Sequence, residues 1–280
     1  MWRQCSYNRG MTDLFRHIRA CNNAVLPGRR IAFKLDGTAV GWVLPDLAAT
    51  LGAHGARRDG DGVDLRAERL APAARALSDA GWFRWRDEAF DVRAGWDGPV
   101  LATIDRGALP AFGIRATGVH MNGLVERADG TWLWVARRAA DKLLDPGKLD
   151  HIAAGGVPAG LTPLQCLAKE AEEEAAIPAS LTARAEPASI LSYAMERPEG
   201  LRQDRLHCYD LVMPEAFTPR AADGEVEAFE LWPLPRVLDR VRDSDDFKFN
   251  VSLVLIDLAL RRGLIAGDEG LRLRAALDAR

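Results

Sequence analysis

The sequence predicts an α/β protein in which a sheet is covered by helices on both faces and follows a small α+β domain. Strand-like and helix-like segments alternate from residue 111 onward, as they do in layered α/β folds. Before that point, two hairpin signals lie among short helical segments. The 280 residues also suffice for two domains of roughly 100–200 residues each. We therefore expect domains at residues 1–110 and 111–280, divided near Ala108-Leu109-Pro110.

The first domain is predicted to begin with a helix and to continue with two hairpins. Thr12 is placed to cap that helix, whose apolar residues at 14, 15, 18 and 21 recur at helical spacing. Asp36-Gly37 is a typical two-residue hairpin turn, and Asp59-Gly60-Asp61-Gly62 marks a second hairpin. Further elements are expected as helices at about 45–51 and 70–80 and as a strand near 100–104.

The second domain is predicted to mix strands with longer helices. Its strands are expected at 113–125, 131–138, 188–195, 205–212 and 225–232. Its helices are expected at 163–176, 234–242, 248–262 and 268–279. Between residues 141 and 156 we expect a long loop.

Composition narrows the class of protein. Apolar residues make up 48% and charged residues 28%, which is typical of a globular chain. The formal net charge is -3, so a protein built chiefly to bind nucleic acid is disfavoured. Four cysteines, at 5, 21, 166 and 208, have neither zinc-site spacing nor the density of a disulfide scaffold, which favours a reducing compartment.

Targeting signals are not visible in the sequence. Residues 1–10 are polar and unlike a signal peptide, and Met11 just before the helix signal suggests that they arise from an upstream start. The longest apolar run, Val251 to Leu260, is far shorter than the roughly 20 residues that span a bilayer. We expect a cytoplasmic protein with no membrane partner.

Candidate chemistry concentrates on a predicted helix within residues 155–178. Thr162 and Gln165 form a capping box, and Pro163 stands at the first helical position. On a helical wheel, an apolar stripe contains Leu164, Leu167, Ala168, Ala171 and Ala175. The neighbouring arc contains Glu170, Glu173 and Glu174.

These three glutamates repel one another, at about 0.2–0.5 kcal/mol for each pair on an exposed helix. Lys169 is the only cation nearby in sequence and lies off their arc on the wheel. A divalent cation such as Mg²⁺ or Mn²⁺ prefers oxygen ligands and would turn the repulsion into attraction. By itself the charge run fits a solvated acidic face better.

The residues around the helix resemble the signature of the Nudix hydrolases. That signature is a glycine, five residues, a glutamate, seven residues, and then Arg-Glu, an apolar residue, any residue, Glu-Glu, any residue, Gly and an apolar residue. The matching positions in this chain are Gly155, Glu170, Glu173, Glu174 and Ile177.

Three positions depart from this signature. Lys169 replaces the arginine, which keeps the charge but loses the bidentate fork. Ala176 replaces the last glycine, which asks for a modest change in how the helix ends. Leu161 replaces the first glutamate, which usually supports the metal ligands in this family.

Longer runs resemble one Nudix subgroup, the domain related to fungal thiamine pyrophosphokinases. They read GVHMNGLV, WVARRAADKLLDPGKLDHIAAGG, LHCYDLVMPEAF and DGEVEAFELWPL. The resemblance implies a Nudix-type α/β/α sandwich with a mixed sheet, preceded by a smaller domain. It also implies Mg²⁺- or Mn²⁺-dependent cleavage of a small-molecule diphosphate, with Glu170, Glu173 and Glu174 as metal ligands. Related proteins convert thiamine diphosphate and its oxidised analogues to the monophosphate and phosphate.

Two further glutamates are candidates for the site. Glu225 and Glu227 lie just before a predicted strand, where Nudix proteins often supply another carboxylate. One of them would serve as an additional ligand or as the base. A turn followed by a water-facing edge strand explains the pair equally well.

Phosphate contacts are expected from the loop regions. Arg137, Arg138 and Lys142 follow a predicted strand, and alternation allows at most one of the two arginines to point into the site. We select Arg137 and Lys142, although surface charge explains each of them too. Gly155 and Gly156 would let backbone amides approach a phosphate, or simply form a tight turn.

Other chemistry-bearing residues fit structural roles better. His120 and His207 lie in strand-like runs, where a lone histidine is usually structural. Trp82, Trp85 and Trp96 could stack on a pyrimidine or thiazolium ring, but the core of a small domain explains them more simply.

Three functions from different classes remain. The leading one is a diphosphatase acting on thiamine-type diphosphates. The second is a Nudix pyrophosphatase of a nucleoside diphosphate derivative such as ADP-ribose or a dinucleotide. The third is a catalytically weak diphosphate-binding module, because of Leu161. A kinase is disfavoured since no glycine-rich loop ends in Gly-Lys-Ser/Thr. A homodimer is left open by the resemblance, although no heptad pattern argues for one.

Overall fold

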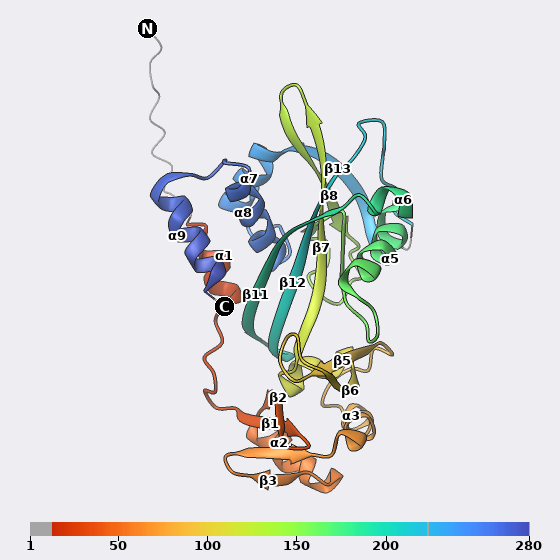
Figure 1. Cartoon of the computed structure of the whole chain (residues 1–280), viewed down its shortest axis with the longest axis vertical. Coiled ribbons are helices and arrows are strands. Elements are labelled where there is room, and N and C mark those ends of the chain that lie inside the picture. Colours follow the sequence, from red (N-terminus) through yellow and green to blue (C-terminus); the bar gives the residue numbers. More distant parts are fainter. Residues whose placement is uncertain (1–12, 223, 280) are drawn as a thin grey trace.

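The structure is a computed structural model that describes residues 13–222 and 224–279 (Figure 1). Its helices are α1 (Phe15–Cys21), α2 (Pro45–Leu51), α3 (Leu70–Asp79), α4 (Leu109–Phe112), α5 (Pro163–Ala175), α6 (Ala179–Thr182), α7 (Leu234–Asp243), α8 (Val251–Arg261) and α9 (Gly267–Asp278). Short 3₁₀ turns are η1 (Gly52–His54), η2 (Ala67–Arg69) and η3 (Arg106–Ala108).

The strands form a four-stranded sheet, a seven-stranded sheet and a separate hairpin. Those of the first sheet and of the hairpin are β1 (Ile31–Leu35), β2 (Thr38–Val43), β3 (Arg57–Asp59), β4 (Gly62–Leu65), β5 (Ala89–Arg93) and β6 (Val100–Asp105). Those of the seven-stranded sheet are β7 (Arg115–Arg127), β8 (Gly130–Arg138), β9 (Leu149–Asp150), β10 (Ala153–Gly156), β11 (Glu186–Arg197), β12 (Gly200–Val212) and β13 (Val226–Pro233).

Residues 22–112, which we call the N-terminal region, contain the smaller sheet. Its order is β2-β1-β4-β3, with β1 and β4 parallel. Both predicted hairpins are confirmed, and Asp36 and Gly37 both adopt the positive φ that a two-residue turn needs. Helices α2 and α3 share the core of this region with its strands, and the β5–β6 hairpin extends that core through Phe90 and Ile104.

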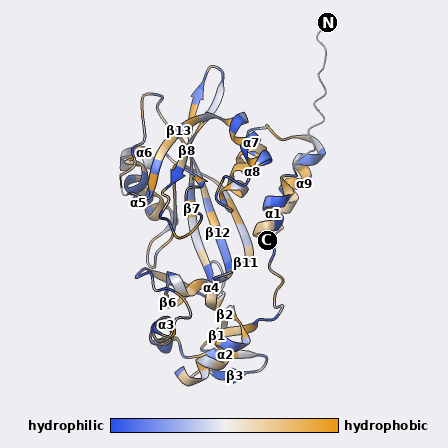
Figure 2. Ribbon diagram, turned by 180° about the vertical axis from the view of Figure 1, so that it is seen from behind, coloured by the Kyte–Doolittle hydropathy of each residue, from blue (hydrophilic) through white to orange (hydrophobic). Residues whose placement is uncertain are grey.

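The seven-stranded sheet is mixed. Its path is β11-β12-β7-β8-β13, with β10 beside β7 and β9 beside β8. The β12–β7 pair is parallel and the other pairs are antiparallel. Helices α5 and α6 cover one face, while α7, α8, α9 and α1 lie on the other side (Figures 1 and 2). This arrangement confirms the predicted α/β sandwich behind an α+β region.

Alternation along the strands separates two cores in the sandwich. In β8, Leu133 and Val135 join the core with α7 and α8, whereas Trp132 and Trp134 pack with the core under α5. Successive residues of a strand point to opposite faces, so β8 contributes to both cores. None of the described helices is long and apolar enough to cross a membrane.

Helix α1 lies apart from the rest of the N-terminal half. Leu14, Ile18 and Cys21 pack into the core formed by α7, α8, α9 and the sheet. Thr12 and Met11 lie outside the described residues, and the carboxylate of Asp13 accepts the Phe15 amide at 2.9 Å. We call residues 113–279 together with α1 the C-terminal unit; a domain boundary at residue 110 stays a proposal.

The segment expected as a long loop contains two short strands. β9 and β10 pair with β8 and β7, respectively. They have two and four residues, which is too short for an alternating pattern to appear. Their pairing with distant strands, rather than local propensity, fixes them.

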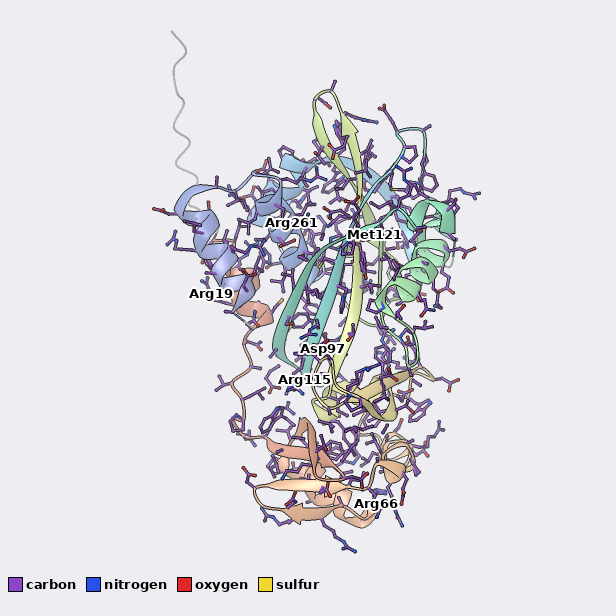
Figure 3. All side chains as sticks on the ribbon, in the orientation of Figure 1. Arg19, Arg66, Asp97, Arg115, Met121 and Arg261 are labelled. Carbon is purple, nitrogen blue, oxygen red and sulfur yellow. The ribbon has the colours of Figure 1, made fainter. Side chains whose placement is uncertain are left out.

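Polar and aromatic contacts join the N-terminal region to the C-terminal unit. Arg205 pairs with Asp97 at 2.9 Å, and the guanidinium groups of Arg205 and Arg115 lie over the Trp96 ring. Figure 3 places Asp97 and Arg115 at this junction and Arg66 at the far end of the N-terminal region. Arg30, almost fully buried, also pairs with Glu196 at 2.7 Å.

Candidate active site

Helix α5 begins and ends as its sequence dictates. The capping box is present: Gln165 N donates to Thr162 Oγ1 at 3.3 Å, and Thr162 N donates to Gln165 Oε1 at 2.9 Å. The helix stops at Ala176, which adopts a left-handed φ of 53°. Glycine takes this conformation without strain, so alanine at this position costs free energy.

The buried face of α5 is turned relative to the predicted stripe. Leu164, expected within that stripe, is 50% exposed, whereas Cys166 and Glu174 are buried. The rotation follows from the contacts of the helix, since Leu167 and Ala171 reach the core against β7 and β10. One of the three glutamates is thereby placed inside the protein.

Glu174 is the buried glutamate, with only 7% of its surface exposed. Its Oε2 accepts the amide of Ala154 at 2.9 Å, and no described cation pairs with it within 4 Å. Burial, reinforced by the negative charge of Asp150, raises the pKa of Glu174 well above its ordinary value. The charge of Lys248 opposes this shift without an ion pair within 4 Å, so an incompletely balanced oxygen donor is held next to β10.

Glu170 lies against β10, the short strand that precedes α5. A Cβ atom built on Gly155 would stand 2.4 Å from Glu170 Cδ, so only glycine leaves room for this carboxylate. Burial raises the pKa of Glu170; the ammonium of Lys169 opposes this shift and the charge of Glu173 adds to it. Gly155 and Glu170, expected in one site, are thus brought into contact.

Glu173 has a cationic partner. Lys169 Nζ lies 2.6 Å from Glu173 Oε2 and 3.7 Å from Glu170 Oε1. The wheel placed Lys169 off the acidic arc, but its long flexible stem reaches both carboxylates. Glu173 is half exposed at the side chain, so its ion pair is open to solvent.

The two glutamates near β13 have different partners. Glu225 forms an ion pair with Lys142, and its negative charge contributes to the raised pKa of Glu170. Burial alone would raise the pKa of Glu225, but the hydrogen bond and charge of Lys142 hold it below the ordinary value. Glu227 instead accepts the amide of Ala140 at 3.1 Å.

The two arginines at the end of β8 diverge, as alternation predicts. Arg138 is buried and pairs with Asp150 at 2.7 Å. Arg137 points to the α7 face, where it lines an open cavity of about 580 Å³ with Trp232, Arg236 and other residues. Neither guanidinium is directed at the α5 glutamates, so the structure does not bring Arg137 together with them.

A buried polar network lies behind Glu174. Asp150 accepts from Arg138 at 2.7 Å and from Lys248 at 3.3 Å, and Nδ1 of His120 lies 2.9 Å from Nδ1 of His151. Burial lowers the pKa of both histidines, to about 4 for His151, which the charge of Asp150 opposes. No local pattern in the sequence predicts this network; its only signal is the polar pair Asp150-His151 between the apolar residues Leu149 and Ile152.

The histidines and Asp150 have their potential ligand atoms within 4.8 Å of one another, and in the described chain no other such group of three is found. Arg138 and Lys248 already place two cations beside Asp150, which opposes binding of a metal ion there. The α5 glutamates do not converge this closely, because Glu173 is turned to Lys169.

The residues of α5 nevertheless fit a hard divalent cation. Glu170 and Glu174 offer carboxylate oxygens, which suit Mg²⁺ and Mn²⁺. Both carboxyl groups have raised pKa values because burial and like charges disfavour their ionised forms. A bound cation would supply the missing positive charge, and the absent side chain of Gly155 leaves the space that Glu170 occupies.

Two of the three tryptophans, Trp85 and Trp96, have contacts that fit a structural role better than stacking on a substrate ring. Trp85 packs against the core of the N-terminal region with Arg75 over its ring. Trp96 faces Arg115 and Arg205, whose charges would repel a thiazolium ring. Trp82 is 40% exposed.

Comparison with protein families divides the chain in two. A model described as "Domain of unknown function (DUF4743)" matches residues 13–116, and one described as "NUDIX domain" matches residues 117–250. The second match contains Glu170, Glu173, Glu174, Glu225 and the network around Asp150.

Among known proteins, this chain is 40% identical over 201 residues to "Nudix hydrolase 20, chloroplastic" of Arabidopsis thaliana, covering 71% of this chain and 54% of that protein. It is 41% identical over 180 residues to "Nudix hydrolase 24, chloroplastic" of the same plant, covering 64% and 49%. The chain thus spans about half the length of these relatives. Among solved structures, DR0079 from Deinococcus radiodurans is 21% identical with a TM-score of 0.48, covering 60% of this chain and 97% of that one.

Proposed function

We propose that this chain is a Nudix hydrolase and that it hydrolyses the diphosphate linkage of a small molecule with Mg²⁺ or Mn²⁺. The observation that supports this proposal most directly is the burial of the Glu170 and Glu174 carboxylates. Two neighbouring carboxylates of α5 are held in or near the interior, and Glu174 has no described cation to pair with. Such an arrangement is costly in an apo protein and becomes favourable when a cation binds.

Glu170 and Glu174 would hold the ion, joined by Glu173 once it leaves Lys169. When bound, the ion neutralises negative charge on the phosphates and draws electron density from phosphorus. Gly155 keeps the backbone close to that position without a side chain in the way.

Hydrolysis also needs a group that accepts the proton of the attacking water. We propose Glu225, because its charge acts on Glu170 and Lys142 keeps it ionised. Glu227 is engaged with the Ala140 amide and is the weaker candidate. Lys142, freed from Glu225 by an anionic substrate, would donate to a phosphate oxygen.

As substrate we propose thiamine diphosphate and its oxidised analogues, which would yield the monophosphate and phosphate. The support is the likeness of four long runs to the thiamine pyrophosphokinase-related subgroup. ADP-ribose or a dinucleotide is the alternative. We also propose a chain that acts in the cytoplasm, without nucleic acid or membrane partners, and leave a homodimer to be tested by its mass in solution.

The test is the release of phosphorylated products from thiamine diphosphate, its oxidised analogues, ADP-ribose and a dinucleotide, each with Mg²⁺ and with chelator. Because cleavage of ADP-ribose or a dinucleotide frees no inorganic phosphate, the monophosphate or nucleotide product of each compound is quantified directly. Chelator-sensitive release that favours the thiamine compounds is expected. A preference for the nucleotides would overturn the proposed thiamine-type substrate. Binding without release of products would identify a binding module. Leu161→Glu distinguishes a silenced site: it should preserve or raise turnover, whereas loss of turnover in a folded variant would mean that the signature is misaligned here.

A further inference from the structure

We infer that the N-terminal region supplies the phosphate-binding cations of this active site, with Arg106 in the leading role and Arg84 and Arg86 beside it. The three residues, which we call the arginine cluster, all precede the Nudix domain match. The inference rests on the proposed function, because it assigns the residues that bind the phosphate end of its diphosphate substrate.

The β5–β6 hairpin lies directly against β10. A Cβ atom built on Gly156 would stand 2.7 Å from Phe90 Cζ and 3.8 Å from Arg106 Cζ. The adjacent glycine, Gly155, has Glu170 in the corresponding position at 2.4 Å. Because successive strand residues face opposite sides, the Arg106 guanidinium and the Glu170 carboxylate lie on either side of β10, each next to a glycine that has no side chain.

Arg106 is held at this position by its own region. Its Nη1 donates to Glu88 Oε2 at 2.8 Å, its backbone amide donates to Glu88 O at 2.7 Å, and its guanidinium lies 5.8 Å from the Phe90 ring centre. The amide of Ala159, in the loop before α5, donates to Ala89 O at 2.8 Å. The side chain of Arg106 is still 48% exposed, so it is available to a ligand.

Asp105 organises the loop that presents the other two arginines. Its buried carboxylate accepts the amides of Arg86, Glu88 and Gly107 at 2.8–3.2 Å. The carbonyl oxygen of Arg84 lies 2.0 Å from where a Cβ of Gly107 would stand, so this loop packs on the turn that carries Arg106. The backbone is thus fixed while the arginine side chains remain free to contact a ligand.

The charges of this cluster are only partly balanced. Partial burial lowers the pKa of Arg86, and the charges of Arg84 and Arg106 lower it further. No ion pair is found for Arg84 or Arg86 among the described side chains. The charge of Arg106 also acts on Glu170 and Glu225, in each case favouring the ionised carboxylate.

A diphosphate lying across the end of β10, at Gly155 and Gly156, would contact both groups of opposite charge. Arginine presents a planar fork that matches phosphate oxygens, so Arg106 would exchange Glu88 for the substrate. The phosphate end then lies toward the N-terminal region. A cationic ring such as thiazolium lies away from it, because the arginines would repel it.

The test is steady-state kinetics of the full chain with the diphosphate that it turns over fastest. Arg106→Ala should raise KM about tenfold while kcat falls less, and Arg106→Lys should lie between, since it keeps charge without the fork. The KM of the unchanged protein should rise with salt, and that of Arg106→Ala should rise less. A merely structural role would not alter this salt dependence.

The matched control is Arg66→Ala. Arg66 is also an exposed arginine with acidic neighbours, Asp36 and Glu68, but lies at the far end of the N-terminal region (Figure 3). Its KM should equal that of the unchanged chain. An Arg106→Ala protein that folds and keeps both KM and its salt dependence would overturn the inference; Arg106→Gln serves if the alanine variant does not fold.

Failure of the proposed function would be seen separately, as no turnover of any diphosphate by the unchanged chain. Binding of methylene diphosphonate with Mg²⁺, followed by calorimetry, then tests the arginine cluster alone. Affinity that falls about tenfold in Arg106→Ala supports the inference, and equal affinity or no binding refutes it.

Discussion

Glu174 in α5 and Asp257 in α8 are buried carboxylates on opposite faces of the same sheet, and their partners differ. Asp257, with no exposed surface, pairs with Arg274 at 2.5 Å and Arg261 at 2.8 Å and accepts from Ser189 at 2.9 Å. Glu174 has the Ala154 amide and no described cation. A buried carboxylate whose charge is balanced by ion pairs has a structural role, as Asp257 does. We propose that Glu174, which has no ion pair within 4 Å among the described side chains and only the more distant charge of Lys248 to favour its ionised form, binds a cation instead.

The largest expected effect is the loss of turnover when Glu174 is replaced, which tests whether this residue binds the cation. Glu174→Gln should lower kcat by about 100-fold or more, because a ligand of the cation is lost. It should also raise the free energy of unfolding of the metal-free protein, since a neutral amide accepts from Ala154 without the cost of a buried charge. Thermal unfolding with chelator, next to turnover with Mg²⁺, measures both.

Glu173→Gln provides the control for that experiment. Glu173 is half exposed and paired with Lys169, so its loss should lower turnover without stabilising the apo protein. If Glu174→Gln unfolded the chain instead, Glu174 would be a structural residue like Asp257. Unchanged turnover would remove it from the ligand set.

Asp257→Asn should lower the stability of the protein and leave its turnover unchanged, which is the opposite of what we expect for Glu174→Gln. Removing one member of a buried ion-pair cluster leaves its arginines without their charge partner, which costs about 3 kcal/mol. Turnover per folded molecule should stay the same, because α8 lies on the face away from α5. Urea unfolding and an assay corrected for the folded fraction decide the matter; a stable but inactive variant would break the comparison.

The paired histidines are an intermediate case, buried yet uncharged. In the unfolded chain His151 takes up a proton below pH 6.5, but in the folded protein its pKa is about 4. Lowering the pH therefore favours the unfolded state, by about 2 kcal/mol for this residue between pH 6.5 and 5. Stability is present above the unfolded pKa and is lost as pH falls toward the folded one.

His151→Asn should remove the contribution of His151 to the pH dependence of the free energy of unfolding. Urea unfolding at pH 7.5 and pH 5 would show that the variant loses less stability on acidification than the unchanged chain. Equal losses in both proteins would mean that His151 already binds a proton in the fold, and that the network holds a charge there.

The smallest expected effect is a change in stability at the C-terminal end of helix α5. Ala176→Gly should stabilise the protein by about 0.5–1 kcal/mol, because glycine adopts a left-handed φ without strain. Turnover should not change. A lower urea midpoint would show instead that the Ala176 methyl group contributes more by packing than its backbone costs.

Local signals predicted most of the elements and the start of the site. The Asp36-Gly37 turn and the Thr162–Gln165 capping box are encoded within four residues, so one sequence suffices to find them. The contact of Gly155 with Glu170 joins residues that one family signature contains.

What escaped prediction depends on distant contacts. Arg137 was placed by alternation alone, which cannot tell which face of the sheet α5 covers. Arg106 lies 64 positions before Glu170, and only the packing of Phe90 on Gly156 brings it near. The burial of Glu174 depends on how α5 rotates against β7 and β10.

The position of α1 makes the N-terminal region an insertion rather than an appendage. The described residues begin in the C-terminal unit at α1, leave it near Asn22, and return through α4 into β7 (Figure 1). Asn22 and Asn23 are tied to β11 by hydrogen bonds to Ala194 and Glu196. The N-terminal region is therefore attached at two chain crossings in addition to the ion pairs of Asp97 with Arg205 and of Arg30 with Glu196. The position of Arg106 beside β10 is thus held by two covalent connections instead of one.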